Sequence, residues 1–193
     1  MKKPKRPDPK GMAAAIRAFL VASGRDAADR ELKDTPARVA KAWMEDFLDG
    51  YAVDPAKVLG KAHPTDSREM VVLGSIDFHS MCPHHLIPYR GLAHVAYVPR
   101  DGVVGFGRIV ELVDAFAHRL ILQEQIAEDV TGTLMTSLGA AGAGCVLDAE
   151  QGCVTMRGPK RRGTRAVTRA FKGTLATDKK LQGAFLKAIG GPR

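Results

Sequence analysis

The sequence predicts an α+β protein built on an antiparallel sheet. Two pairs of segments have the alternating apolar pattern of strands, and two consecutive segments with helical periodicity separate the pairs. The connections within each pair are too short for the crossover that parallel strands require, so the paired strands are expected to run antiparallel. The expected order is two helices, two strands, two helices, two strands and a last helix.

The N-terminal part of the chain is predicted to be helical. Residues 11–23 carry apolar side chains at helical spacing and end before Gly24. A second helix is expected to begin at Thr35 and Pro36, because a capping residue followed by proline is typical of a helix start. This helix extends to about Leu48, and a polar stretch rich in proline and glycine then leads to the sheet.

The later elements are predicted from the same two periodicities. Strands are expected at residues 70–79, 91–98, 144–156 and 164–175. Two helices are expected between Arg108 and about Leu138, and a short one at 179–189. The predicted organisation is a disordered basic tail over residues 1–10, a helical segment over 11–66 and a main domain over 67–193.

The composition is typical of a soluble globular protein with one sizeable core. The chain has 193 residues, of which 45% are hydrophobic and 26% charged. No apolar run approaches the roughly 18 residues of a membrane span, and the N-terminus lacks the apolar region of a secretion signal. Its three cysteines have no regular spacing, which indicates a reducing cytoplasm rather than a disulfide framework. Cys145, within an apolar stretch, is expected to be a plain core residue.

The net charge of +8 is concentrated in two regions. Five of the first ten residues are basic, and a second cluster runs from Lys160 to Arg165. Basic residues close after Cys153 favour an anionic substrate such as a phosphorylated nucleotide. A nucleic-acid surface is the rival interpretation, but the 6% of aromatic residues are not interleaved with the basic ones, so nucleic acid is not expected as a partner. A solvated charged loop is the third interpretation.

The segment around residue 82 carries the strongest chemical signal. Cys82 and His85 have the C-x-x-H spacing that aims a thiolate and an imidazole at one cation. Cys153 would add a third soft ligand from a different strand, and a Cys2His set with one open position is typical of catalytic zinc. His84 would then lie beside the metal as a proton-transfer group. The alternative is that the cysteines are small buried residues and the histidines surface residues without a role.

Several motifs, in order along the chain, carry a resemblance to a known family. They are the helix Asp34-Thr35-Pro36-x-Arg38-Val39-x-x-x-Trp43, the loop Phe78-His79-Ser80-Met81-Cys82-x-His84-His85-Leu86-x-Pro88, the strand Gly91-x-Ala93-His94-Val95-Ala96-Tyr97-Val98-Pro99, the pair Gln123-Glu124, and Cys153-x-x-Met156-Arg157-Gly158. Together they resemble the GTP cyclohydrolase I family over roughly residues 12–190.

The resemblance implies a fold and a metal site. The family has the T-fold, a ββααββ antiparallel sheet with a helical pair, which makes residues 67–193 the catalytic domain. Its members assemble into toroidal homo-oligomers, typically decamers with sites between subunits. Cys82, His85 and Cys153 would be the ligands of Zn²⁺, with water in the fourth position, and His84 would transfer protons.

The resemblance also implies a reaction in pterin and folate synthesis. In the family, the metal-activated water attacks C8 of the guanine ring of GTP, formate leaves, and the ribose rearranges to give dihydroneopterin triphosphate. Glu124 would bind the N1–H and 2-amino edge of the purine beside Gln123. Arg157 matches a triphosphate-binding arginine, and Arg108 takes the place of a phosphate-binding lysine.

Several positions depart from the family pattern. Gln151 replaces a histidine two residues before the second metal cysteine, and an amide cannot transfer a proton at neutral pH. Glu111 replaces an arginine of the phosphate segment, in which Gly107 also replaces a serine. Pro83 replaces a glutamate, and Gln125 stands where an arginine is expected. These changes affect the catalytic and phosphate-binding positions, whereas the metal ligands are retained.

Three functional hypotheses follow. The favoured one is a zinc-dependent cyclohydrolase acting on GTP or a related guanine compound. The second is a T-fold paralogue that binds a purine or pterin without the full reaction. The third is an enzyme with changed chemistry that stops at a ring-opened intermediate or accepts a less phosphorylated substrate.

Overall fold

The centre of the molecule is a four-stranded antiparallel sheet. The computed structural model describes residues 7–158 and 160–190. The strands are β2 (Val71–Met81), β3 (Pro88–Val98), β5 (Gly142–Gln151) and β6 (Arg165–Gly173), and they lie in the order β2-β3-β5-β6. All three pairings are antiparallel. The predicted α+β class with an antiparallel sheet is therefore confirmed.

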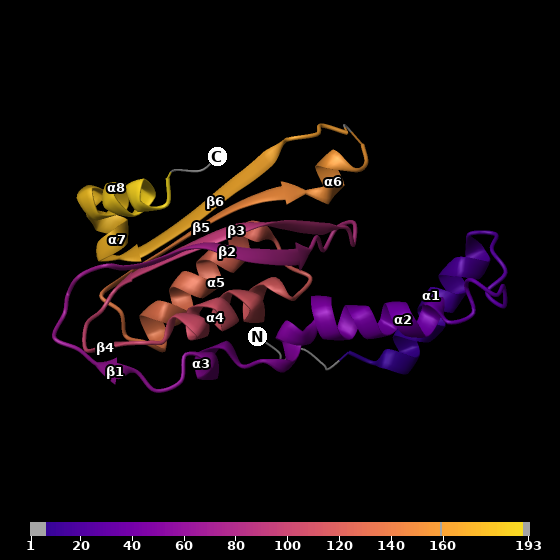
Figure 1. Cartoon of the computed structure of the whole chain (residues 1–193), viewed down its shortest axis with the longest axis horizontal. Helices are drawn as coiled ribbons and strands as arrows, with labels where there is room; N and C mark the ends of the chain where they lie inside the picture. Colours follow the sequence, from indigo (N-terminus) through magenta and orange to yellow (C-terminus); the bar gives the residue numbers. More distant parts are fainter. Residues whose placement is uncertain (1–6, 159, 191–193) are drawn as a thin grey trace.

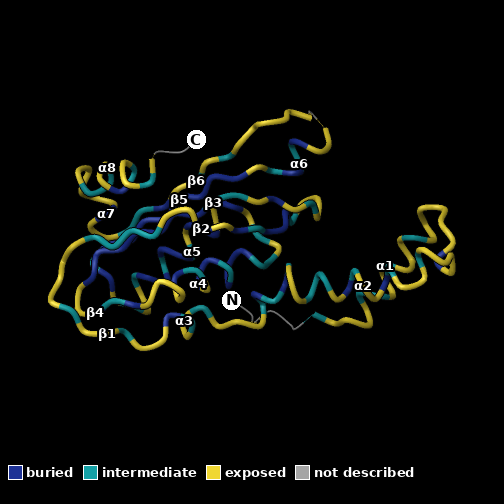
Figure 2. Tube along the Cα trace, in the orientation of Figure 1, coloured by how far each residue is buried: buried dark blue, intermediate teal, exposed yellow. Residues whose placement is uncertain are grey.

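Two helices cover one face of this sheet. They are α4 (Phe106–Ala117) and α5 (Gln123–Thr136), and Figure 1 shows both beneath the strands. Their apolar stripes are buried against inward-facing strand residues. Figure 2 shows dark blue, buried stretches both in these helices and in the strands that they cover. Apolar residues that recur at helical spacing in these two helices are buried, namely Ile109, Leu112, Val113, Phe116, Ile126, Val130 and Leu134, whereas Leu138, beyond the end of α5, is half-buried.

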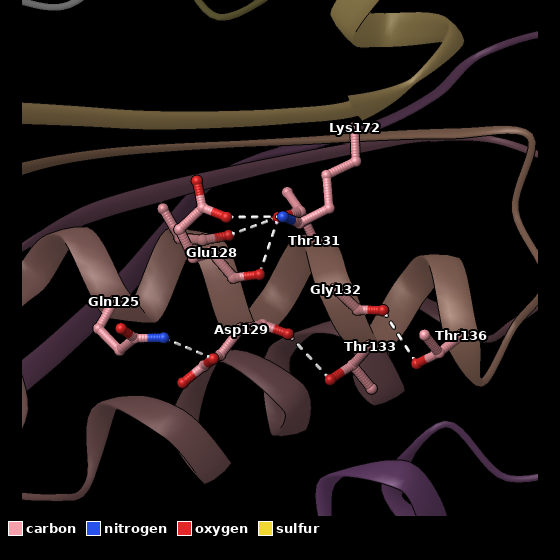
Figure 3. Close-up of polar contacts among 9 residues, drawn as sticks. Gln125, Glu128, Asp129, Thr131, Gly132, Thr133, Thr136 and Lys172 are labelled. Carbon is pink, nitrogen blue, oxygen red and sulfur yellow. Dashed lines mark hydrogen bonds and ion pairs between the residues drawn. The ribbon is translucent and has the colours of Figure 1, made fainter.

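Helix α5 contains three threonines, although threonine has a low helix propensity. The hydroxyls of Thr131, Thr133 and Thr136 each donate to the carbonyl four residues earlier, at 2.9 Å (Figure 3). Because the helix satisfies these hydroxyls itself, Thr131 can be fully buried without another partner. On the sheet side, Lys172 of β6 donates to Glu128 at 2.6 Å and links the strand to the helix (Figure 3).

The opposite face of the sheet is covered at one end only. There, α7 (Thr174–Thr177) and α8 (Lys179–Ala188) pack Leu175 and Phe185 against β3 and β5. The other end of this face presents charged side chains around an open hollow of about 590 Å³: Asp77, Arg90, Asp148, Glu150 and Arg165. Helices thus cover one face of the sheet but only part of the other. The end of this second face that lies near the Cys82 turn is accessible to solvent.

The N-terminal segment is mostly helical, and in Figure 1 its first two helices extend away from the sheet, whereas its last helix lies below α4. It contains α1 (Pro9–Ala22), α2 (Thr35–Ala42), the π-helical turn η1 (Trp43–Phe47), the 3-10 turn η2 (Asp49–Ala52) and α3 (Pro55–Val58). The Asp8 carboxylate caps α1, so this helix begins at Pro9, within the span predicted as a tail. Residues 1–6 of that tail lie outside the described residues. Among the described residues, no helix has the length and apolarity needed to cross a membrane.

Several details differ from the sequence-based expectation. Helix α3 lies within the predicted polar stretch, and α7 begins at Thr174, inside the strand predicted at 164–175. A two-stranded sheet pairs β1 (His63–Pro64) with β4 (Gly102–Val103), where the sequence indicated only an irregular polar stretch. The strand predicted at 144–156 ends at Gln151, and a one-turn helix, α6 (Gly152–Thr155), follows it. The β-branched and apolar residues of this segment suggested a strand, but the Met156 amide donates to the Gly152 carbonyl at 2.9 Å and closes a helical turn. Cys153 is therefore placed by a helix, not by a strand.

Candidate metal centre and adjoining cavity

The first half of the metal centre is a tight turn after β2. The Cys82 amide donates to the Ile87 carbonyl at 3.1 Å, and the Leu86 amide donates to the Cys82 carbonyl at 2.9 Å. Leu86 adopts a φ of 52°, a left-handed conformation that non-glycine residues rarely take. This closed loop returns the His85 ring toward the strand end, so that His85 Nδ1 lies 3.8 Å from Cys82 Sγ.

The second half comes from α6. Tyr89 of β3 lies opposite Gln151 of β5, which places α6 beside the loop that joins β2 to β3. Gly152 permits the close approach, since a Cβ there would lie 2.5 Å from the Pro88 carbonyl oxygen. As a result, donor atoms of Cys82, His85 and Cys153 all lie within 4.8 Å of one another. The structure thus brings together the three ligands that the sequence predicted.

The chemistry of this donor set fits a zinc ion. Two ligand atoms at tetrahedral angles around zinc, one sulfur and one nitrogen, lie about 3.5 Å apart, close to the separation of Cys82 and His85. Burial and the neighbouring Cys82 raise the pKa of Cys153, while the charge of Arg157 opposes this shift. A bound cation would reverse the effect, because metals bind thiolates. The other cysteine, Cys145, is fully buried in β5, and burial raises its pKa to about 12, as expected of a core residue.

A cavity of about 200 Å³ is lined by two of the three candidate ligands, Cys82 and Cys153. Its wall includes His84 from the turn, Gln123 and Glu124 from the start of α5, and Gln151 from the end of β5. The remaining wall residues are Cys82, Pro83, Tyr89, Ile121, Leu122, Cys153 and Ala166. Four predicted site residues outside the ligand set therefore converge on one space.

The two arginines predicted to bind phosphate do not line this cavity. Arg157 follows α6 and is near enough to influence the Cys153 thiol. Arg108 lies in the first turn of α4, where its guanidinium donates to Glu111 at 2.7 Å. The acidic replacement noted in the sequence is thus the direct partner of Arg108, and it neutralises the charge that a phosphate would need.

Two features of the wall were not predicted. Tyr89 is buried, and its hydroxyl donates to the Ile121 carbonyl at 3.0 Å, while burial raises the pKa of its phenol. The alternation of side chains along β3 places Tyr89 on the side of the sheet that faces the helices. This alternation could have predicted from the sequence that Tyr89 is buried. The second feature is a 2.6 Å hydrogen bond from Gln151 Nε2 to Gln123 Oε1. These residues are distant in the sequence, and no local pattern indicates their contact.

The four-stranded antiparallel sheet with a helical pair on one face defines a T-fold protein. The Cys–His–Cys cluster at the end of the sheet gives this protein a candidate metal centre. Comparison with known proteins specifies the family. The model of the family described as GTP cyclohydrolase I matches residues 12–190. The chain belongs to the GTP cyclohydrolase I family.

Individual relatives agree with this assignment. GTP cyclohydrolase 1 of Chromobacterium violaceum is 41% identical over 175 residues, which cover 91% of this chain and 85% of the relative. The protein of the same name from Ralstonia nicotianae is 39% identical, with coverages of 92% and 85%. That from Bacillus cytotoxicus is 42% identical, with coverages of 91% and 93%.

Proposed function

We propose that this protein is a zinc-dependent GTP cyclohydrolase I, which opens the imidazole ring of GTP and forms formate and dihydroneopterin triphosphate. The observation that carries the proposal is the convergence of Cys82, His85 and Cys153 beside a cavity that also contains His84 and Glu124. Membership of the GTP cyclohydrolase I family supports the identity of the reaction. When bound, zinc would supply the Lewis acidity that makes hydroxide available at neutral pH.

Glu124 is the proposed anchor of the guanine ring. Its carboxylate lies in the first turn of α5, where the helix dipole stabilises negative charge. Two oxygens of one carboxylate match two parallel donors, the N1–H and the 2-amino group of guanine. Glu124 lines the cavity with the ligand cysteines, so a ring held there would lie next to the metal position.

His84 is the proposed proton-transfer residue. It is exposed at the cavity wall, and its ring centroid lies 6.3 Å from that of the ligand His85. An imidazole is suited to this task because its ordinary pKa is close to neutral pH. His84 can therefore exchange protons with solvent on one side and with a bound ring on the other.

The triphosphate is assigned to Arg157 and to Lys160, Arg161 and Arg162, with Arg108 as a further contact. Arg165 is left out because its guanidinium already donates to Asp148, at 2.6 Å. Arg108 lies away from the cavity of its own chain, which favours sites formed between subunits. Two further observations support self-association. Strands β2 and β6 are the edges of the open sheet, and α1 buries no residue while Phe19 is 66% exposed. We propose a toroidal homo-oligomer, a decamer as in the family.

The proposed compartment is the cytoplasm. The three cysteines, Cys82, Cys145 and Cys153, are free thiols in the structure. A reducing environment keeps such thiols available as metal ligands.

A second candidate function is a reaction that stops at a ring-opened intermediate or uses another purine or pterin. Two observations favour it. An amide at Gln151 occupies a cavity position where the family has a histidine, and it cannot relay a proton. Arg108 is paired with Glu111 and so is less available to a triphosphate.

One experiment separates these functions. The zinc-loaded protein is incubated with GTP, and formate and pterin fluorescence are both measured, with Cys153→Ala as the control that lacks a ligand. Formate together with pterin fluorescence supports the complete reaction. A ring-opened product without fluorescence supports the second candidate. Binding of GTP with neither product would overturn both and leave a purine-binding protein.

A further inference from the structure

The side chain of Gln123 is held in one orientation by two strands. It is only 4% exposed, and its Nε2 donates to the Leu147 carbonyl of β5 at 3.1 Å and to the Ala166 carbonyl of β6 at 2.9 Å. A primary amide has two N–H donors, and both are used. Reversing this amide would place its oxygen against two carbonyl oxygens, so Gln123 Oε1 must point the other way.

The fixed oxygen of Gln123 in turn orients Gln151. Gln151 Nε2 donates to Gln123 Oε1 at 2.6 Å, and Gln151 lines the cavity. An amide that presents its nitrogen to Gln123 must turn its oxygen elsewhere. In the part of the chain that the structure describes, the Gln151 side-chain amide makes one hydrogen bond, through Nε2, and its Oε1 has no protein hydrogen-bond partner. The chain of contacts from the two backbone carbonyls through Gln123 therefore leaves an acceptor oxygen at the cavity.

We propose that Gln123 is a positioning residue that fixes the polarity of Gln151, so that this part of the cavity offers an acceptor to a hydrogen-bond donor. The group that it accepts from is a water molecule or an N–H of a bound ring. The identity of the donor group rests on the proposed function. The orientation of the Gln151 amide does not depend on that function.

The same contact has a consequence for a histidine placed at position 151. A neutral imidazole has one N–H, and Gln123 Oε1 would take it. The other ring nitrogen would then face the cavity as an acceptor, in a single tautomer. Any gain in activity from Gln151→His should therefore require Gln123.

The alternative is that Gln123 only joins α5 to β5 and β6. A double-mutant cycle distinguishes the two roles, because a residue that acts through Gln151 has no effect once Gln151 is replaced. The variants are Gln123→Met, Gln151→Met and the double replacement, which preserve side-chain length. Gln182→Met is the matched control, since Gln182 Nε2 also donates to two backbone carbonyls, those of Leu175 at 2.6 Å and Ala176 at 3.2 Å, and Gln182 does not line the cavity.

Two quantities are measured on each variant: the dissociation constant for zinc by competition with a chelator, and kcat for formate release from GTP. We expect Gln123→Met to weaken zinc binding and lower kcat by about 10-fold in the wild-type background. In the Gln151→Met background the same change should have an effect of less than about 2-fold. Gln182→Met should leave both quantities unchanged.

Equal losses from Gln123→Met in both backgrounds would show a purely structural role and overturn the proposal. If Gln123→Met does not fold, Gln123→Lys replaces it, because an ammonium still donates to the two carbonyls but offers no acceptor to Gln151. If the wild-type protein releases no formate, the proposed function fails. The role of Gln123 is then decided by the dissociation constants for zinc alone, through the effect of Gln123→Met in the wild-type protein and in Gln151→Met.

Discussion

His118 Nδ1 lies 2.9 Å from Asp49 Oδ1 and joins the end of α4 to η2 of the N-terminal segment. The His118 ring also lies over that of His79, with 4.5 Å between the centroids. His79 Nε2 in turn lies 2.8 Å from the Asp46 carbonyl oxygen. The N-terminal segment is thus fastened to β2 just before the strand reaches Cys82.

Removing this connection should loosen the N-terminal segment. Asp49→Ala deletes the acceptor of a half-buried hydrogen bond and should lower the free energy of unfolding by about 1 kcal/mol. It should also speed proteolysis between η2 and α3. Glu31→Ala is the control, because the pair that Glu31 forms with Arg30 is exposed. Identical proteolysis of both variants would show that the His118 contact does not hold the segment.

The stability should also depend on the ionisation of Asp114. Burial raises the pKa of this carboxyl above its ordinary 3.8, although His118 and His79 oppose the shift. A raised pKa means that the folded state favours the protonated form, so this stabilisation is present at low pH and is lost as the pH rises through the folded pKa. Asp114→Asn should therefore gain stability relative to wild type between pH 3.8 and neutral.

Thermal unfolding midpoints of Asp114→Asn and wild type across this pH range provide the measurement. A difference that stays constant with pH would show that Asp114 ionises equally well in the folded and unfolded chains.

Zinc should bind at one ion per subunit and should require Cys153. Cys153→Ala leaves one thiolate and one imidazole, too few donors for a stable zinc site, so its metal content should fall to a small fraction of the wild-type value. Elemental analysis measures this, and Cys145→Ala is the control because Cys145 is outside the ligand set. Wild-type metal content in Cys153→Ala would contradict the ligand assignment.

Glu124 should be required for binding of the guanine ring. Glu124→Gln replaces one carboxylate oxygen by an N–H that faces a purine donor, which should cost about 1–3 kcal/mol of binding free energy. Calorimetric titration of the zinc-loaded protein with GTP gives the affinity. Glu128→Gln is the matched control on the same helix, because Glu128 pairs with Lys172 and does not line the cavity. Equal GTP affinities for wild type and Glu124→Gln would remove Glu124 from the substrate site.

Restoring the family residues should raise turnover of GTP. Loss of one general acid or base typically costs about 10²–10⁴-fold in rate, so Gln151→His should increase pterin formation. Adding Glu111→Arg should increase it further, because the change removes the carboxylate that now pairs with Arg108. Steady-state pterin formation at saturating zinc measures both effects. Wild-type activity that Gln151→His does not raise would show that another group delivers the proton.

Periodicity predicted the helices and strands because burial of one face dominates their formation. Ile109, Leu112 and Val113 follow the helical spacing, and the structure buries all three. The end of the strand predicted at 144–156 was wrong, since a local turn at Gly152 depends on close packing against Pro88, a contact that a one-dimensional pattern does not contain. The small sheet formed by β1 and β4 was not predicted either, because strands of two residues are too short to show a periodicity.

The sequence predicted the candidate metal ligands but not the contacts between the residues around them. Cys82 and His85 were identified by local spacing, and Cys153 by its residue type as a possible third soft ligand. The approach of Cys153 to Cys82 needed the structure, because it arises from the pairing of β3 with β5. The Gln123–Gln151 bond required the structure, since the orientation of Gln123 is set by carbonyls on two strands that helix α5 crosses.

The register between Tyr89 and Gln151 also sets the order in which the metal centre can form during folding. Cys82 and His85 leave the ribosome long before Cys153, and alone they provide only two donors. The third donor arrives once β5 has paired with β3, so high metal affinity coincides with completion of the sheet. For the proposed zinc ion, binding energy would thereby become folding energy, and free zinc in the cell would shift newly made chains toward the native state.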